Sequence, residues 1–231
     1  MTKSMDTNTV EIFKMEHKKS LEMKLSQLRD TILEDDIALE KEMIEIFTES
    51  LSAHGKSKSQ INQIAQVSRV LGELLGFDVR YCDRLEEAAK IYDIGNVMIC
   101  KDIYAKEEKL SFEEFKVVKN HTFIGYYLLK AQGLPSTDLA SVISLEHHEW
   151  WNGRGYPSQI KSHDINMASR IVAVADTIGA LFSKRPGRSA WEYKKIVEYI
   201  ASRSGIQFDP EVVEVLCCNQ EIISEILHTD L

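Results

Sequence analysis

Long apolar runs, disulfide patterns and leader sequences are all lacking in this chain of 231 residues. The longest apolar runs, such as residues 171–175, fall far short of the roughly 20 residues that a membrane-spanning helix needs. Residues 1–15 mix Lys, Asp and Glu with scattered apolar side chains, unlike the apolar core of a signal peptide. The four cysteines form no CxxC pair, so we expect reduced thiols and no zinc knuckle. These absences predict a cytoplasmic protein with no membrane segment.

The chain also has no excess of positive charge and few prolines. The net charge is −8, and no block of Lys and Arg alternates with aromatic residues, which argues against a nucleic-acid polymer as partner. A small anionic ligand is still compatible with this balance if basic residues gather locally. Only four prolines interrupt a pattern in which apolar residues recur three and four positions apart. We therefore expect an all-α fold.

Caps and breakers divide this pattern into separate helices. Gly76 ends an amphipathic helix, and Ser111 with Glu114 has the spacing of a capping box. Polar loops are expected at 52–59 and 101–109. The expected helices cover residues 61–75, 84–92, 111–130, 136–151, 167–181 and 190–204, and a last helix begins near Pro210.

The N-terminal segment carries a separate apolar stripe. Leu21, Leu25, Leu28 and Ile32 alternate spacings of four and three, and the spacing resumes within residues 39–46. Only about two heptads run unbroken, so packing within the chain and self-association into a homodimer both remain open. We expect a helical extension over residues 1–45 and the main domain over residues 46–231.

Metal-ligating residue types recur at or near the expected helix ends. Imidazole and carboxylate groups suit divalent iron, manganese and zinc. Each residue taken singly also has an ordinary interpretation, as a surface histidine or a buried, hydrogen-bonded aspartate. Adjacent helical residues diverge by about 100°, so two neighbouring histidines can share a site only where several helices meet. The candidate ligands are Asp93, His121, His147, His148 and Asp176.

Two motifs give the chain a family resemblance. Residues 92–96, Tyr-Asp-Ile-Gly-Asn, resemble the HDIGK motif, and residues 147–157, HHEWWNGRGYP, resemble the HHExxxGxGYP motif of the HD-GYP proteins. His121, Asp176 and the segment Arg185-Pro-Gly-Arg188 follow in the expected order. The resemblance covers residues 46–216, approximately.

The resemblance implies an α-helical HD-domain bundle whose members cleave cyclic di-GMP, or related cyclic dinucleotides, with two or three metal ions. In such members one metal is held by two histidines and two aspartates. The neighbouring metal is held by the HD aspartate, the middle histidine and the HH pair. The resemblance further assigns ligand contacts to Tyr156, Gly155, Arg185 and Arg188.

This chain departs from the family pattern at the first metal site. Gln60 stands where the first histidine is expected, Tyr92 replaces the histidine of the HD pair, and Asn96 replaces the lysine that faces the substrate phosphate. Lys56 stands where some members carry a glutamate for a third metal. His54 lies six residues before Gln60, across a glycine, and is a poor substitute. We therefore expect the first site to be lost.

The second site keeps its protein ligands, so we expect one transition metal ion, iron or manganese or else zinc. Asp176 remains available beside it.

Three functions are compatible with this pattern. The favoured one is a degenerate HD-GYP signalling domain that binds metal, together with cyclic di-GMP or a signalling protein at residues 153–157, and that hydrolyses little or nothing. The alternatives are a weak metal-dependent cyclic di-GMP phosphodiesterase and a helical adaptor without metal. For Arg185 and Arg188 the competing interpretation is a solvated loop, and for Tyr156 a turn residue packed on a tryptophan.

Overall fold

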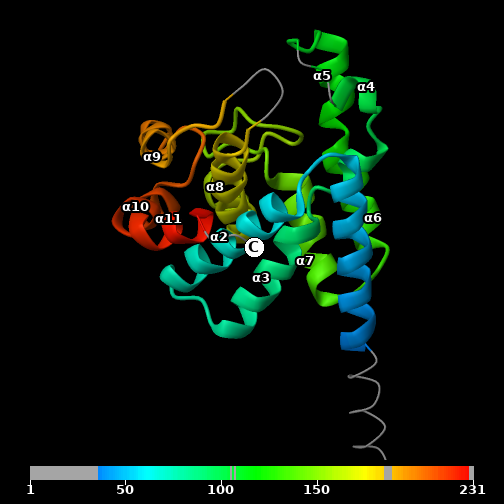
Figure 1. Ribbon diagram of the computed structural model, residues 1–231, viewed down its shortest axis with the longest axis horizontal. Coiled ribbons are helices and arrows are strands. Elements are labelled where there is room, and N and C mark those ends of the chain that lie inside the picture. Colours follow the sequence, from blue (N-terminus) through cyan, green and yellow to red (C-terminus); the bar gives the residue numbers. More distant parts are fainter. Residues whose placement is uncertain (1–35, 105, 107, 185–188, 229–231) are drawn as a thin grey trace, which may run out of the picture. The chain divides into compact units, whose positions relative to one another are not determined.

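The computed structural model describes residues 36–104, 106, 108–184 and 189–228, and their regular secondary structure is helical (Figure 1). The expected all-α fold is confirmed. The chain divides into two units, Met1–Glu42 and Met43–Leu231. The apolar stripe at positions 21–32 lies outside the described residues, and the proposed boundary after residue 45 stays a prediction.

The described helices begin with a helix over residues 36–54, drawn in blue in Figure 1. Two short 3₁₀ helices, η1 and η2, interrupt the α-helical succession. The further elements are α2 Lys58–Leu74, α3 Val79–Ile91, η1 Ile94–Met98, α4 Lys101–Tyr104, α5 Phe112–Lys119, α6 His121–Lys130, α7 Pro135–Glu146, η2 Ser162–Asp164, α8 Met167–Phe182, α9 Tyr193–Ser202, α10 Pro210–Cys218 and α11 Gln220–His228.

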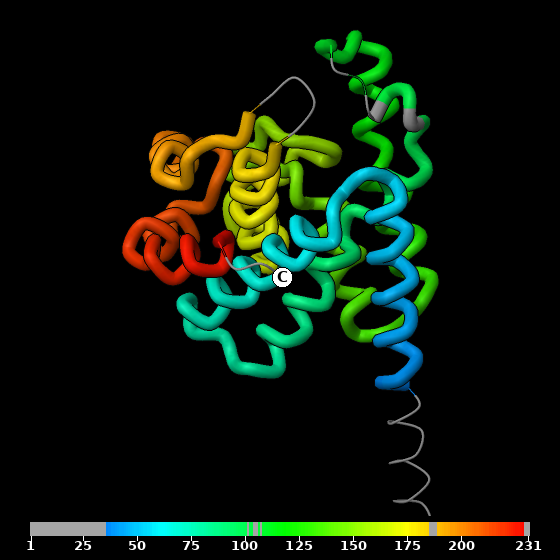
Figure 2. Tube along the Cα trace, viewed as in Figure 1, coloured from blue at the N-terminus to red at the C-terminus, as the bar shows by residue number. Residues whose placement is uncertain are grey.

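The core of the unit Met43–Leu231 forms around α2, which packs against α3 and α8 (Figure 2). The apolar face predicted for α2 is buried from Ile61 to Leu71, while Leu74 at its end is partly exposed. α7 packs against α3, α6 and α8. Burial of such apolar faces is the main favourable term in folding. This packing brings the ends of α3, α7 and the start of α6 together.

Several helix boundaries differ from the sequence expectation. α3 begins at Val79 rather than at residue 84, because the Asp78 side chain caps it by accepting from the Tyr81 backbone N–H. The expected helix 111–130 is two helices that meet at Asn120. The capping box of Ser111 and Glu114 is confirmed. The last helix is also divided, into α10 and α11.

The expected helix 136–151 ends early, at Glu146. His147 is its C-cap, and His147 and His148 together form the turn that follows. The two histidines therefore do not share a helix interior. Because the helix ends before them, the angle between their side chains is not fixed at the roughly 100° that separates successive residues within a helix.

Candidate metal centre and its cavity

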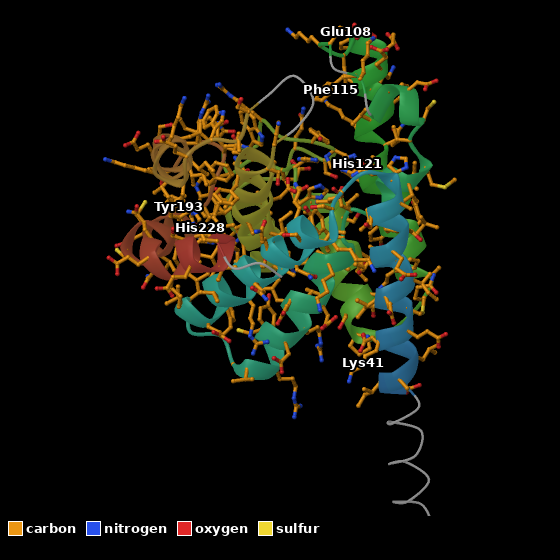
Figure 3. The ribbon with its side chains drawn as sticks, in the orientation of Figure 1. Lys41, Glu108, Phe115, His121, Tyr193 and His228 are labelled. Carbon is orange, nitrogen blue, oxygen red and sulfur yellow. The ribbon has the colours of Figure 1, made fainter. Side chains whose placement is uncertain are left out.

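Close backbone packing sets the position of the Asp93 carboxylate. Tyr92 caps the C-terminus of α3, and Asp93 directly precedes η1. At Gly95 a Cβ atom would lie 2.0 Å from the His121 carbonyl oxygen and 2.7 Å from the Gly125 nitrogen. Only glycine permits this approach, and it holds η1 against the first turn of α6. Asp93 is thereby brought beside His121. His121 is the first residue of α6 and is labelled in Figure 3.

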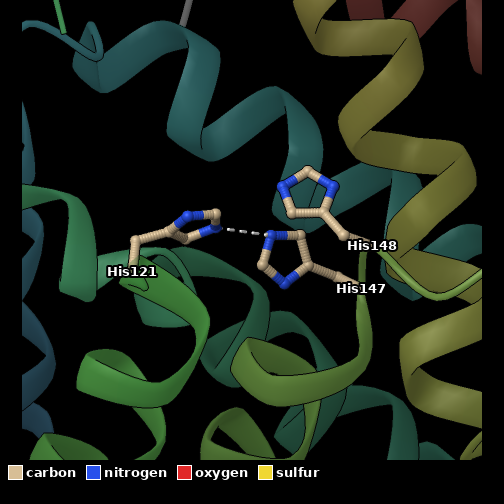
Figure 4. A group of neighbouring side chains, drawn as sticks. All are labelled: His121, His147 and His148. Atoms are coloured by element: carbon tan, nitrogen blue, oxygen red, sulfur yellow. Dashed lines mark hydrogen bonds between the residues drawn. The ribbon is translucent and has the colours of Figure 1, made fainter. Parts of the chain in front are cut away.

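His121 and His147 point their Nε2 atoms at each other, 3.3 Å apart (Figure 4). The Nδ1 atom of His121 lies 2.6 Å from the Val118 carbonyl oxygen, and that of His147 lies 2.9 Å from the Ile143 carbonyl oxygen. Carbonyl oxygens only accept, so both Nδ1 atoms carry the proton in the neutral rings and both Nε2 atoms present lone pairs. Two facing lone pairs cannot bond to each other. A shared cation satisfies both.

His148 and Asp93 complete this group. His121, His147 and His148 each offer one side-chain nitrogen, and these nitrogens lie within 4.8 Å of one another. Asp93 Oδ1 lies 3.5 Å from His121 Nε2 and 3.9 Å from His147 Nε2. That oxygen is buried and has no hydrogen-bond partner among the described residues. Three imidazoles and an orphaned carboxylate oxygen are a donor set that fits a divalent transition metal.

The protonation states agree with this assignment. Burial lowers the pKa of His147, against the pull of Asp93. Burial and the imidazoles of His147 and His121 hold the pKa of His148 well below its ordinary value. Burial raises the pKa of Asp93, but Lys56 and the three imidazoles more than offset this, so its pKa is well below the usual range. His147 and His148 are therefore held as neutral imidazoles and Asp93 as a carboxylate, which are the ligating forms.

Asp176, on α8, joins a second cluster beside the histidines. The Tyr92 hydroxyl donates to Asp176 Oδ1 at 2.5 Å. The Lys56 ammonium lies 3.0 Å from Tyr92 Oη, 3.2 Å from Asp93 Oδ2 and 3.4 Å from Asp176 Oδ1. Sequence reasoning named Lys56 as a departure from the family pattern but gave it no role. The sequence gives little indication of this position, because a single lysine in a polar loop is expected to be exposed to solvent.

A cavity of about 560 Å³ opens over both clusters. This volume is within the range of small-molecule sites. Gln60 is buried at its wall and donates to the Gly179 carbonyl oxygen at 3.4 Å, and Asn96 is buried there too. The lining residues are His54, Gly55, Lys56, Gln60, Asp93, Asn96, Val118, His121, His148, Tyr156, Asp176, Ala180 and Lys184.

The turn 152–157 folds back so that Tyr156 covers the histidines. Its ring lies 4.7 Å from the His148 ring, and its backbone N–H donates to the His148 carbonyl oxygen. Glu149 Oε1 accepts from the backbone N–H groups that follow the turn, at Ser158 and Gln159. A Cβ at Gly155 would lie 2.3 Å from the Trp150 nitrogen, so this glycine allows the turn to close. The Tyr156 ring contacts His148 and Phe115, and burial raises its pKa.

The structure thus brings together four of the five candidate ligands, and it links Asp176 to them through Lys56 and Tyr92. Arg185 and Arg188, assigned to ligand contact, lie outside the described residues. Within the described ranges, no helix combines the length and apolarity that a bilayer crossing requires.

This fold and this cluster are those of an HD domain. The chain belongs to the HD domain family, whose model matches residues 34–212. The family recognised from the sequence motifs is therefore confirmed. A cyclic di-GMP phosphodiesterase of Thermotoga maritima is 30% identical over 230 residues, which are 98% of this chain and 62% of that protein. The cyclic di-GMP phosphodiesterase response regulator RpfG of Xanthomonas campestris is 33% identical over 162 residues, 70% of this chain and 43% of that protein.

The chain spans less than two thirds of the length of both relatives. Among solved structures, Bd1817, a HDG"Y"P protein from Bdellovibrio bacteriovorus, aligns with a TM-score of 0.56 at 18% identity. That alignment covers 73% of this chain and 53% of Bd1817, and it supports the shared fold.

Proposed function

We propose that this chain is an HD-GYP signalling domain that binds a single transition metal ion and a cyclic dinucleotide, and that hydrolyses the dinucleotide slowly or not at all. The observation that carries the proposal is the meeting of two bare Nε2 atoms, from His121 and His147, with the orphaned Asp93 Oδ1. The relatives named above act, by their names, on cyclic di-GMP. The cavity over the cluster supplies room for part of such a ligand.

His121, His147, His148 and Asp93 would hold the metal. A divalent ion held there would supply electrostatic stabilisation to a phosphate oxygen. The chain itself contributes the shape of the cavity, the aromatic face of Tyr156 and the buried amides of Gln60 and Asn96. Gln60 and Tyr92 offer no imidazole for a second ion, and Asn96 offers no positive charge to a phosphate. Efficient two-metal hydrolysis therefore lacks its ligands.

The test measures metal, binding and turnover on the same preparation. Elemental analysis of protein loaded with iron or manganese should give about one ion per chain. Calorimetry should show cyclic di-GMP binding, while chromatography should show turnover far below that of an intact family member. Two tightly held ions per chain, or turnover equal to that of the intact homologue, would contradict the proposal.

A weak metal-dependent phosphodiesterase is the second candidate. The complete ligand set at His121, His147, His148 and Asp93 favours it, as do the names of the relatives. In this case linear dinucleotide or GMP accumulates in proportion to the metal loaded, and His147→Ala abolishes it. A chain that takes up no iron or manganese at all would instead be the helical adaptor.

Two protein contacts belong to the same proposal. The turn 153–157 is the segment that we propose for a signalling partner. Its backbone N–H groups at Gly153 and Tyr156 donate to the carbonyl oxygens of Trp150 and His148, and its tyrosine lines the cavity. The N-terminal segment is the one that we propose for a homodimer. Pull-down of partner proteins with the wild type and with Arg154→Glu, a substitution in the turn, tests the first contact. Light scattering of the wild type and of Leu25→Lys measures the oligomeric state and tests the second.

A further inference from the structure

Lys56 is a buried cation whose donors are already used. Its side chain is only 7% exposed, although it lines the cavity. An ammonium group has three N–H donors and no acceptor. Tyr92 Oη, Asp93 Oδ2 and Asp176 Oδ1 all lie within 3.4 Å of Nζ and account for these donors. Lys56 is therefore not available to bind a phosphate of the ligand.

The surroundings of Lys56 favour its charged form. A buried charge is stable only when it is paired and hydrogen-bonded. Two carboxylates face Nζ, and the Tyr92 ring lies beneath it with a centroid distance of 4.8 Å. The Tyr92 hydroxyl accepts a hydrogen bond from Lys56 and donates one to the Asp176 carboxylate. Tyr92 is thus part of the cradle that holds the ammonium.

The Asp93 carboxylate is shared between two cation positions. Its Oδ2 faces the Lys56 ammonium, and its Oδ1 faces His121 and His147. A metal ion that bridged Asp93 and Asp176 would need the space that Nζ fills. We propose that the Lys56 ammonium is a permanent substitute for a second metal ion, held between Asp93 and Asp176, and that it limits the chain to one exchangeable ion. This inference rests on the proposed function, in which that one ion binds at the histidines.

The proposal changes what a repair of the site requires. From the sequence alone, Gln60→His with Tyr92→His is expected to raise the metal content toward two, because it restores two imidazoles. With Lys56 in place, that double variant should keep about one ion. The ammonium fills the space between Asp93 and Asp176, and its positive charge repels a second divalent cation there. Adding Lys56→Ala to the double variant should raise the content to about two ions per chain.

The experiment loads four proteins with Mn²⁺ and measures metal content by elemental analysis and folding by circular dichroism. They are the wild type, the Gln60→His/Tyr92→His variant, and that variant with either Lys56→Ala or Lys58→Ala. Lys58 is the matched control, because its side chain is 59% exposed and lies two positions away. Contents of one, one, two and one support the proposal. Two ions in the double variant, or one ion in a folded triple variant with Lys56→Ala, overturn it.

A measurement on the wild-type chain guards against misfolded variants. Reductive methylation followed by mass spectrometry should modify Lys58 readily and leave Lys56 protected, both without metal and with excess Mn²⁺. Methylation of Lys56 at the rate of Lys58, or its onset when Mn²⁺ is added, shows that the ammonium is not fixed and overturns the proposal. A wild-type content of two ions would instead refute the single-metal function, so the two failures are distinguishable.

Discussion

At the scale of the residue, the two bare Nε2 atoms of His121 and His147 are the feature with the most direct chemical meaning. Their Nδ1 atoms are tied to main-chain carbonyls, so neither ring can rotate its lone pair away without losing a hydrogen bond. Backbone carbonyls in this role fix the tautomer and direction of metal-ligating histidines. The pair is therefore prepared for a cation before one arrives.

His147→Ala should lower the affinity for Mn²⁺ by more than about 100-fold, because even a partner of a ligand contributes 10- to 100-fold and His147 is itself a ligand. Calorimetric titration of metal-free protein measures this. His163→Ala is the control, since His163 is exposed and lies outside the cluster. Unchanged affinity in a folded His147→Ala protein would remove this residue from the metal site.

Tyr92→Phe should lower the free energy of unfolding by roughly 1.5–3 kcal/mol, since the hydroxyl is hydrogen-bonded to a charged ammonium and a charged carboxylate. Urea denaturation at neutral pH gives the value. Tyr127→Phe is the matched control, because Tyr127 is 68% exposed, and it should change stability by less than about 0.5 kcal/mol. Equal effects of the two substitutions would show that the Tyr92 hydroxyl does not contribute through these bonds.

At the scale of the element, the helices of the core could be predicted because their apolar residues keep a helical period. The face of α2 from Ile61 to Leu71 is an example. Boundaries were missed where one side chain or one turn decides them. Asp78 starts α3 earlier than its apolar pattern suggests, and the backbone turns at Asn120, between α5 and α6.

The contact between η1 and α6 gives a prediction at this scale. Gly95→Ala should destabilise the fold by several kcal/mol and reduce metal binding, because the added Cβ meets the His121 carbonyl oxygen at 2.0 Å and backbone must move. Gly133→Ala, at a positive φ with open space around it, should cost only about 1–2 kcal/mol. Thermal denaturation and Mn²⁺ titration of both variants check this. A Gly95→Ala protein as stable as Gly133→Ala would contradict the packing.

At the scale of the whole molecule, the site residues could be predicted individually but not as a geometry. The motifs pointed to Asp93, His121, His147 and His148, and the fold brings these together. The position of Lys56 could not be predicted, because it depends on how the loop before α2 meets α3 and α8 across long sequence separations. Contacts of that kind leave no periodic signal in a single sequence.

Stability of the metal-free protein should depend on pH through these histidines. Burial lowers the pKa of His147 and His148 in the folded state, whereas in the unfolded chain both lie near 6.5. Below about pH 6.5 the unfolded state therefore binds more protons, and stability falls as the pH falls toward the lowered values. Between about pH 7.5 and about pH 5.5 the loss should be roughly 1–3 kcal/mol.

Urea denaturation of chelator-treated protein at several pH values measures this dependence. His147→Ala should flatten the curve, because one of the two groups with a lowered pKa is removed. A stability that rises from neutral pH toward about pH 5.5 would reverse the sign and show that the imidazoles are charged in the folded state.

The ammonium between Asp93 and Asp176 also affects how the site responds to metal supply and to oxidants. A cation that is part of the polypeptide cannot be removed by a chelator, has a single oxidation state, and is present in every copy as soon as the chain is made. Scarcity of iron or exposure to an oxidant can therefore alter only the histidine end of the cluster. The acidic end keeps its charge balance, so emptying the site leaves the segment after α3, at Asp93, joined to the interior of α8, at Asp176.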